Sequence, residues 1–317
     1  MTMTQVPLVI RRHKLVSIVR NDIQNRNIIV GVSGGGDSIA LLLLCVAASM
    51  QQSSTFKVIV GHINHGLRKE ADEEQSHVES ICDSLGIPCF TKKISVQAKN
   101  GSIAAGARDA RYEALCGIAR ENNFSTIAVA HHADDQLETM LMALCRGSGA
   151  RKLAGMASSR NLTDNIVLVR PLLHVEKKTL LDICTIASVG WCEDPTNTDQ
   201  STPRGRLRQE VIPVLRELWT SADRHAANGS TLLHAAIDVF ESAIPTGTSW
   251  SRETLQQFPT SIVAAAMHNA IGNQATYETI ESITRAIADD NTKPRSFVCS
   301  NGCTTNVTAH RVEVVYT

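Results

Sequence analysis

The 317-residue chain lacks the features that would place it in a membrane or outside the cell. No apolar run reaches the roughly 20 residues that a membrane-spanning helix requires, and residues 1–14 show no apolar run followed by a cleavage site. The nine cysteines are odd in number and include no Cys-x-x-Cys pair, which argues against a secreted disulfide framework. These absences predict a cytoplasmic protein with reduced thiols and no membrane partner.

Aromatic residues and net charge are also scarce. Aromatics make up 4% of the chain, and 31 Lys and Arg balance 31 Asp and Glu. The sequence therefore has neither an aromatic stripe for stacking RNA bases nor the overall basic charge of most nucleic-acid-binding proteins. The charge is uneven, however, because Arg204, Arg206 and Arg208 alternate in one short stretch. Any nucleic-acid contact is expected to be local.

Short apolar runs alternate with helical patterns through the first two thirds of the chain. The expected strands are 28–32, 58–63, 88–94, 126–130 and 166–169, and the expected helices are 37–50, 70–85, 104–121, 134–145 and 176–189. Such an alternation predicts an α/β fold with a doubly wound parallel sheet. After Trp219 the pattern becomes mainly helical, with a β-rich tail. We therefore expect a catalytic domain at 1–218 and a smaller, mainly helical domain at 219–317.

A glycine-rich turn, Ser33-Gly34-Gly35-Gly36-Asp37-Ser38, joins the first expected strand to the first expected helix. Backbone N–H groups at such a turn bind phosphate, and glycines allow the close approach. In the phosphate loop of many NTPases a lysine stands at the position of Asp37. A carboxylate is repelled by a triphosphate unless a cation lies between them, so the turn predicts ATP with Mg²⁺ at Asp37. The alternative is a purely structural turn in which Asp37 caps the helix, but three consecutive glycines are more than such a cap needs.

Two further motifs carry charged side chains. Arg108 and Arg111 lie on one helix face, where they could clamp an anion or pair with neighbouring acids. Asp135 and Glu138 follow the fourth expected strand, and acids there could hold an amine or a metal or accept a proton. Zinc bound by histidines of the same segment is a further alternative, but adjacent histidines rarely point the same way.

The glycine turn resembles the signature of the N-type ATP pyrophosphatases, which have an adenine nucleotide alpha hydrolase-like fold. Together with four other motifs, in order, residues 25–216 resemble the tRNA(Ile)-lysidine synthetase family. Those motifs are Asn64-His65-Gly66-Leu67-Arg68, Ala107-Arg108-Asp109-Ala110-Arg111-Tyr112, His131-His132-Ala133-Asp134-Asp135-Gln136-Leu137-Glu138-Thr139 and Glu193-Asp194-Pro195-Thr196-Asn197. One position departs from the family, because Gly205 stands where Asn usually follows the arginine at 204.

The resemblance implies a ligase that uses ATP to adenylate C2 of the wobble cytidine of tRNA(Ile) with anticodon CAU. The amine of free L-lysine then displaces AMP to form lysidine. By this resemblance ATP would bind to Ser33, Gly34, Gly35, Gly36, Asp37 and Ser38, and Asp37 would also hold Mg²⁺. Arg111 would stabilise the α-phosphate or position the base, while Asp135 and Glu138 would bind lysine and take its proton. The tRNA backbone would be contacted by Arg204, Arg206 and Arg208. A PP-loop tRNA thiolase is the alternative, and the assembly is left open, a homodimer included.

Overall fold

The computed structural model describes residues 6–51, 54–64, 70–94, 103–193, 201–272, 275–299 and 302–316. The chain divides into two compact units, residues 1–234 and 235–317. The expected loops at 65–68 and 194–197 lie outside the described residues.

A six-stranded sheet forms the centre of the first unit, in the order β3-β2-β1-β4-β6-β5. Its strands are β1 (Ile28–Gly31), β2 (Val58–Asn64), β3 (Cys89–Lys93), β4 (Thr126–Ala128), β5 (Ser159–Thr163) and β6 (Ile166–Val169). All neighbouring pairs are parallel except β5 and β6. The five predicted strands and the doubly wound parallel sheet are thus confirmed, whereas the antiparallel edge strand β5 was not predicted.

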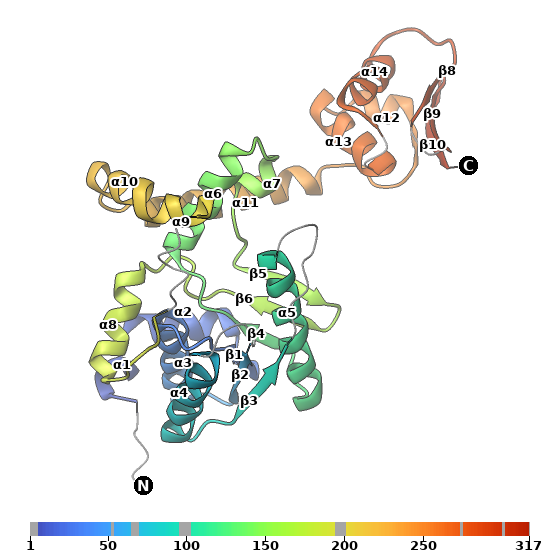
Figure 1. Cartoon of the computed structure of the whole chain (residues 1–317). Helices are drawn as coiled ribbons and strands as arrows, with labels where there is room; N and C mark the ends of the chain where they lie inside the picture. The colour runs from blue at the N-terminus through green and yellow to red at the C-terminus, as the bar shows by residue number, and fades with distance from the viewer. Residues whose placement is uncertain are drawn as a thin grey trace. The chain divides into compact units, whose positions relative to one another are not determined.

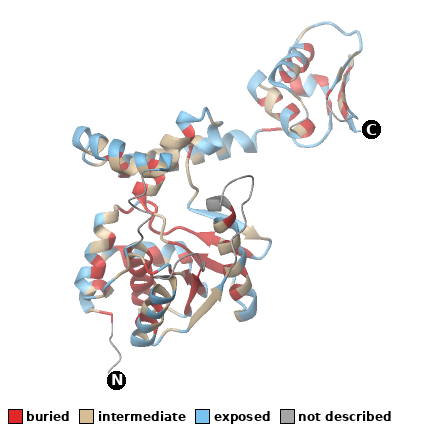
Figure 2. Ribbon diagram, viewed as in Figure 1, coloured by how far each residue is buried: buried red, intermediate tan, exposed pale blue. Residues whose placement is uncertain are grey.

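Helices cover both faces of this sheet (Figure 1). They are α1 (Leu8–Arg11), α2 (Lys14–Ile23), α3 (Gly36–Ser49), α4 (Glu70–Leu85), α5 (Ile103–Asn122) and α8 (Lys177–Ala187). Two further helices, α6 (Ala133–Cys145) and α7 (Ala150–Leu153), extend away from the sheet (Figure 1). Alternate residues of β1 enter different cores: Ile28 and Val30 pack with α2, α3, α4 and α8, while Ile29 packs with α5. Because side chains alternate across a strand, a continuous apolar run is what a strand covered on both faces requires. Figure 2 shows these strands buried.

The helix after the glycine turn is buried on all sides. Nearly every residue of α3 from Ile39 to Ala48 is inaccessible to solvent, and α1, α2 and α8 all contact it. The run of leucines in α3 is therefore a core element, as the sequence predicted. Its burial fixes the N-terminus of the helix, and with it the glycine turn, at the carboxyl edge of β1.

The two units meet inside a long helix, not at the predicted residue 218. The segment contains α9 (Pro203–Arg206), a π-helical stretch (Leu207–Val211), α10 (Ile212–Leu218) and α11 (Ala222–Ser242). The first half of α11 belongs to the first unit because Asp223 pairs with Arg216 at 2.9 Å and Ser230 hydrogen-bonds to Gln136 of α6. The change of sequence pattern at Trp219 marks a turn between helices, so the predicted boundary lies 16 residues before the observed division after 234.

The second unit packs helices on a four-stranded antiparallel sheet, in the order β7-β10-β9-β8. It contains β7 (Ser249–Ser251), α12 (Arg252–Gln256), α13 (Thr260–Ile271), α14 (Tyr277–Ala288), β8 (Arg295–Val298), β9 (Cys303–Val307) and β10 (Arg311–Tyr316). The buried Arg252 donates to the carbonyl oxygens of Ala286 and Ile287 at the end of α14, at 3.0 and 3.1 Å. A cation placed there satisfies carbonyl groups that the helix cannot pair itself.

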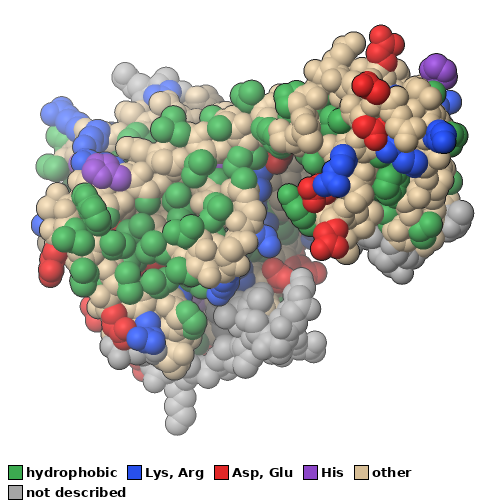
Figure 3. All heavy atoms as spheres, turned by 90° about the horizontal axis from the view of Figure 1, so that it is seen from above, with side chains coloured by type: hydrophobic (Ala, Val, Ile, Leu, Met, Phe, Trp, Pro, Cys, Tyr) green, Lys and Arg blue, Asp and Glu red, His purple; other side chains and the backbone are tan. Residues whose placement is uncertain are grey.

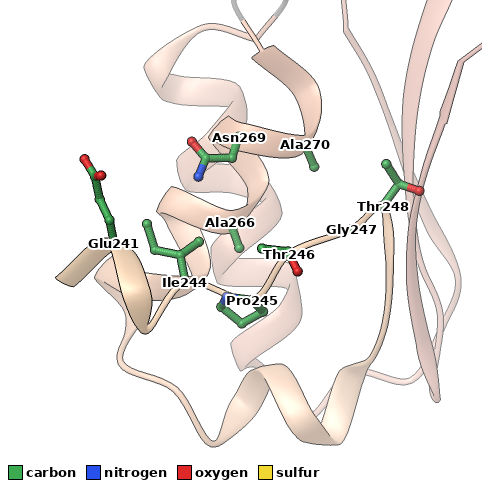
Figure 4. A pocket seen from close by; sticks show the side chains of 9 residues that line it. All are labelled: Glu241, Ile244, Pro245, Thr246, Gly247, Thr248, Ala266, Asn269 and Ala270. Carbon is green, nitrogen blue, oxygen red and sulfur yellow. The ribbon is translucent and has the colours of Figure 1, made fainter. Parts of the chain in front are cut away.

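A cavity of about 280 Å³ lies within the second unit (Figure 4). Ile244, Pro245, Ala266 and Ala270 give it an apolar wall, and Glu241 and Asn269 lie at its side. None of the residues predicted for ATP, lysine or tRNA lines this cavity. Among the helices that the structure describes, none is both long and apolar enough to cross a bilayer.

Candidate active site

Hydrogen bonds of its two serines, Ser33 and Ser38, fix the conformation of the glycine turn. Ser38 Oγ donates to the carbonyl oxygen of Gly35 at 2.8 Å and accepts the backbone N–H of Ser33 at 3.2 Å. Gly34 has a φ of +95°, a conformation that strongly favours glycine. A Cβ on Gly36 would lie 2.5 Å from Leu181 Cδ2, so this position has no room for a side chain. The turn thus presents backbone N–H groups at the start of α3, where an anion is stabilised.

Asp37 lies in the first turn of α3 beside two cationic side chains. Its Oδ2 is 3.4 Å from His132 Nε2 and 3.9 Å from Lys177 Nζ. Its Oδ1 is buried and has no hydrogen-bond partner among the described residues. A buried carboxylate oxygen without a partner is costly, and cation binding would satisfy it. Asp37 therefore fits the predicted role of a metal ligand next to phosphate.

His132 stands among three carboxylates. Asp37, Asp134 and Asp135 each approach one of its ring nitrogens within 3.5 Å. Burial alone would lower the pKa of His132, but Asp135, Asp134 and Asp37 outweigh it and raise the pKa to about 10. The imidazole is consequently a buried cation at neutral pH and a charge partner for the three carboxylates. Within the described part of the chain no group of three metal-binding side chains occurs.

Asp134 connects this centre to the segment after α9. It accepts the backbone N–H of Lys177 at 3.2 Å and pairs with Arg216, which also binds Asp223 at 2.9 Å. Burial would raise the pKa of Asp134, but His132 and Arg216 hold it well below its usual value. Asp134 is thus a charged structural link between α6, α8 and α10.

The predicted lysine-binding acids hold two of the predicted RNA-binding arginines. Glu138 is fully buried and accepts Arg204 Nε at 2.6 Å and Arg208 Nε at 2.7 Å. Asp135 Oδ1 lies 3.3 Å from Arg204 Nη2. Arg206 instead points away and pairs with Glu210 at 2.8 Å on the surface. Asp135 and Glu138 therefore form a cation-binding pair, and Arg204 and Arg208 face inward in this structure.

Viewed from above, Lys and Arg side chains are scattered among hydrophobic and uncharged ones (Figure 3). Exposed apolar side chains of the segment after α9 include Val214, Leu218 and Trp219.

Arginines gather instead around Tyr112 of α5. The Cζ atoms of Arg108, Arg111 and Arg160 lie 5.7, 5.4 and 5.0 Å from the centre of its ring. The sequence brought Arg108 and Arg111 together by their helical spacing, whereas Arg160 comes from the unpredicted strand β5. The pairing of Arg108 or Arg111 with neighbouring acids, which the sequence left open, is not found among the described ion pairs.

His131 connects the arginines to the glycine turn. Its Nδ1 accepts Arg170 Nε at 3.2 Å, and the next residue is His132. Burial lowers the pKa of His131 well below its usual value, and the charges of Arg170, Arg108 and Arg111 lower it further. His131 is therefore neutral, in contrast to its charged neighbour.

This contrast gives a testable pH dependence. A histidine whose pKa is depressed by folding contributes stability above its unfolded pKa, and that stability is lost as the pH falls. From about pH 7.5 to about pH 5, we expect the free energy of unfolding of the wild type to decrease relative to that of His131→Gln, because the opposing contribution of His132, whose pKa is raised, is common to both proteins. Urea unfolding at several pH values measures it. Equal slopes for the two proteins would show that His131 is not held neutral.

Most of the chain matches a known protein family. The model of the PP-loop domain family matches residues 8–215, well over half of the chain. The chain belongs to this family. PP-loop domains use ATP, in agreement with the glycine turn predicted to bind it, so we call residues 33–38 the PP-loop.

Two relatives with similar sequences are both described as tRNA(Ile)-lysidine synthase. The protein of Chromobacterium violaceum is 36% identical over 229 residues, which cover 72% of this chain and 50% of the relative. The protein of Actinobacillus pleuropneumoniae serotype 3 is 38% identical over 194 residues, 61% of this chain and 44% of the relative. The chain therefore spans about half the length of the curated relatives it matches.

A solved structure shares the fold at lower identity. The U34-tRNA thiolase NcsA from Methanococcus maripaludis superposes with a TM-score of 0.59 at 16% identity, covering 70% of this chain and 79% of the thiolase. Similarity at this level supports the PP-loop architecture alone. His132, Lys177 and Arg160 were missed as site residues by the sequence, because only the fold brings them to the PP-loop or to Tyr112.

Proposed function

We propose that this PP-loop protein is an ATP-dependent tRNA(Ile)-lysidine synthase. The observation that carries the proposal is the pair of cation-binding acids, Asp135 and Glu138, in the first two turns of α6, where His132 links Asp135 to Asp37 of the PP-loop. To join lysine to an adenylated base, an enzyme needs a turn that binds ATP and, beside it, acidic groups that bind an amine. The names of the matching relatives support the same activity.

The PP-loop residues would bind the phosphates of ATP. Backbone N–H groups at the start of α3 face the anion, and Lys177 adds a positive charge beside Asp37. This lysine comes from α8 and would supply the charge that the loop itself lacks, because Asp37 replaces the lysine of other phosphate loops. Arg111 would then stabilise the α-phosphate or position the base.

Asp37 would hold Mg²⁺ through its buried Oδ1, which has no partner among the described residues. The ion, when bound, neutralises charge on the pyrophosphate leaving group. His132 would balance the remaining carboxylates and keep Asp37 oriented. It lies within 3.5 Å of both Asp37 and Asp135, so it also connects the ATP site to the amine site.

Free L-lysine would bind through its ammonium group to Asp135 and Glu138. These acids already bind the guanidinium groups of Arg204 and Arg208. A substrate ammonium has the same charge, and Arg204, at 40% side-chain exposure, is able to move aside. The amine must lose a proton before it attacks, since lysine is a cation at neutral pH. Asp135, the less buried of the two acids, is our candidate acceptor.

A PP-loop tRNA thiolase remains the second candidate. It shares the fold with the thiolase described above, and sulfur transfer would require reactive cysteines. Cys184 is buried, and its burial raises the pKa of the thiol to about 12, which leaves it protonated. Cys192 is half-buried beside Gly34, but burial raises the pKa of its thiol as well. Cys145 is free and exposed on α6. The preference for an amine over a sulfur donor therefore rests on the acid pair, Asp135 and Glu138.

Release of AMP distinguishes the two candidates. The protein is incubated with ATP and tRNA of anticodon CAU, with either L-lysine or a sulfide donor added. We expect AMP formation with turnover in the presence of lysine and none above background with sulfide alone. Turnover that depends on sulfide and ignores lysine would replace the proposal by the thiolase.

Lys177 gives a prediction with a matched control beside it. Lys177→Gln removes a charge 3.9 Å from Asp37, while Lys178→Gln changes an exposed residue of the same helix. We expect Lys177→Gln to lower kcat/KM for ATP by about 10²-fold, the scale of losing one charge-stabilising group. Lys178→Gln should retain the wild-type value, and Lys177→Arg should recover part of the loss. Equal kinetics for the two glutamine variants would remove Lys177 from the ATP site.

A further inference from the structure

Four arginines surround Tyr112 without a carboxylate to balance them. Arg108 and Arg111 lie on α5, Arg160 on β5, and Arg170 directly after β6. Across the part of the chain that the structure describes, none of these four is paired with an acid. By contrast, Arg204, Arg206 and Arg208 all have acidic partners. Four arginines without an acidic partner among the described residues are thus gathered around Tyr112.

The cluster is unfavourable as it stands. Arg170 is 3% exposed, and its guanidinium lies close enough to Arg160 and Arg108 for their charges to oppose its own. Arg111 Nε is buried and has no hydrogen-bond partner among the described residues. Like charges and an unsatisfied donor both cost free energy, and such arrangements occur where a ligand supplies what is missing. The missing ligand must be an anion with several acceptor oxygens.

The cluster combines a fixed inner part with an accessible outer part. Arg170 is anchored, since Nη1 donates to the carbonyl oxygen of Ala157 at 2.6 Å and Nε to His131 at 3.2 Å. Arg108 and Arg160 are exposed. An anion could therefore approach from solvent and meet guanidinium groups from different elements. Planar guanidinium groups bind phosphate oxygens in pairs, which a single lysine cannot do.

We infer that Arg108, Arg160 and Arg170 form a binding site for a phosphodiester of the RNA chain next to the target base. The identity of the RNA in this inference rests on the proposed function. The phosphates of ATP are a second source of the same chemistry, but they are already assigned to the PP-loop, Asp37, Lys177 and Arg111, which is why Arg111 is not included in this site. The cluster is separated from that loop by His131 and His132. A backbone phosphate held there would fix the strand while the base turns into the site.

Salt dependence of RNA binding tests the inference. The full chain is titrated with tRNA of anticodon CAU over about 50 to 200 mM KCl, where each phosphate contact to a single strand adds about 0.7 to the slope of log K against log salt. Arg160→Gln and Arg108→Gln should each lower that slope by about 0.7 and weaken binding at every salt concentration. Arg120→Gln, an exposed arginine in the last turn of α5, is the matched control and should keep the wild-type slope.

Two further readouts complete the test. Arg160→Gln relieves like-charge repulsion, so its melting temperature should equal or exceed that of the wild type, which excludes misfolding as the cause. ATP affinity should be unchanged. An unchanged salt slope in both variants would overturn the inference, as would a loss of ATP affinity with intact RNA binding. RNA binding is measured without lysine, so a wild type that binds RNA but transfers no lysine would refute the proposed function and leave this site standing.

Discussion

Asp37→Asn is expected to abolish ATP–pyrophosphate exchange, with a loss of about 10³-fold or more. Asparagine keeps the size of the side chain but cannot provide the negative charge that Oδ1 offers a cation. Lys177 would also lose its carboxylate neighbour, and His132 would lose one of its three, since both lie within 4 Å of Oδ2. Exchange of labelled pyrophosphate into ATP measures the adenylation half of the reaction by itself.

The control for this variant is Asp182→Asn, an exposed aspartate on α8. It removes the same charge from the same unit without touching the PP-loop, so it should exchange at the wild-type rate. Binding of ATP to Asp37→Asn in the absence of Mg²⁺ should be nearly unaffected, because the variant lacks a metal ligand and not a phosphate contact. Exchange retained in Asp37→Asn would reject the metal role.

Glu138→Gln is expected to lower both stability and the use of lysine. The carboxylate is fully buried and receives hydrogen bonds from Arg204 and Arg208. Loss of its charge leaves Asp135 as the remaining carboxylate beside two guanidinium groups, which should cost about 2–4 kcal/mol of unfolding free energy, since both arginines are partly solvated. Urea unfolding measures the stability, and the KM for lysine should rise about tenfold or more because the ammonium loses its buried partner.

Glu210→Gln is the matched change on the surface. It breaks the exposed pair with Arg206, which should leave the free energy of unfolding almost unchanged because solvent screens the pair. The lysine KM of this variant should equal that of the wild type. If Glu138→Gln is as stable as Glu210→Gln and uses lysine normally, the inward-facing arginines and the amine pocket are both wrong.

Four of the strands, β1, β2, β4 and β6, were predictable because they are buried on both faces. In β1 every residue from Ile28 to Val30 is apolar, so a continuous run identified the strand without any partner. β5 was missed for the opposite reason: it is an edge strand, Ser-Arg-Asn-Leu-Thr, with one side exposed, and its residues read as a polar loop. The edge strand nevertheless matters, since it places Arg160 over Tyr112.

The site was only half predictable. Glycines and Asp37 form a contiguous motif, and their function follows from the local backbone. The partners of Arg204 and Arg208 are 66 and 70 residues away in the chain, and nothing in a short segment encodes that encounter. Helical spacing likewise could not show that His132 lies among three carboxylates. Long-range ion pairs, which the sequence does not reveal, therefore determine that Arg204 and Arg208 face Glu138.

The central claim is that this PP-loop domain joins lysine to a cytidine of tRNA. The most direct test is mass analysis of the wobble nucleoside after incubation of the full chain with ATP, Mg²⁺, L-lysine and tRNA of anticodon CAU. The account predicts a cytidine heavier by one lysine less one water, dependent on both ATP and lysine. An unmodified cytidine with an active, folded protein, or a base that has gained sulfur in place of oxygen, would contradict it.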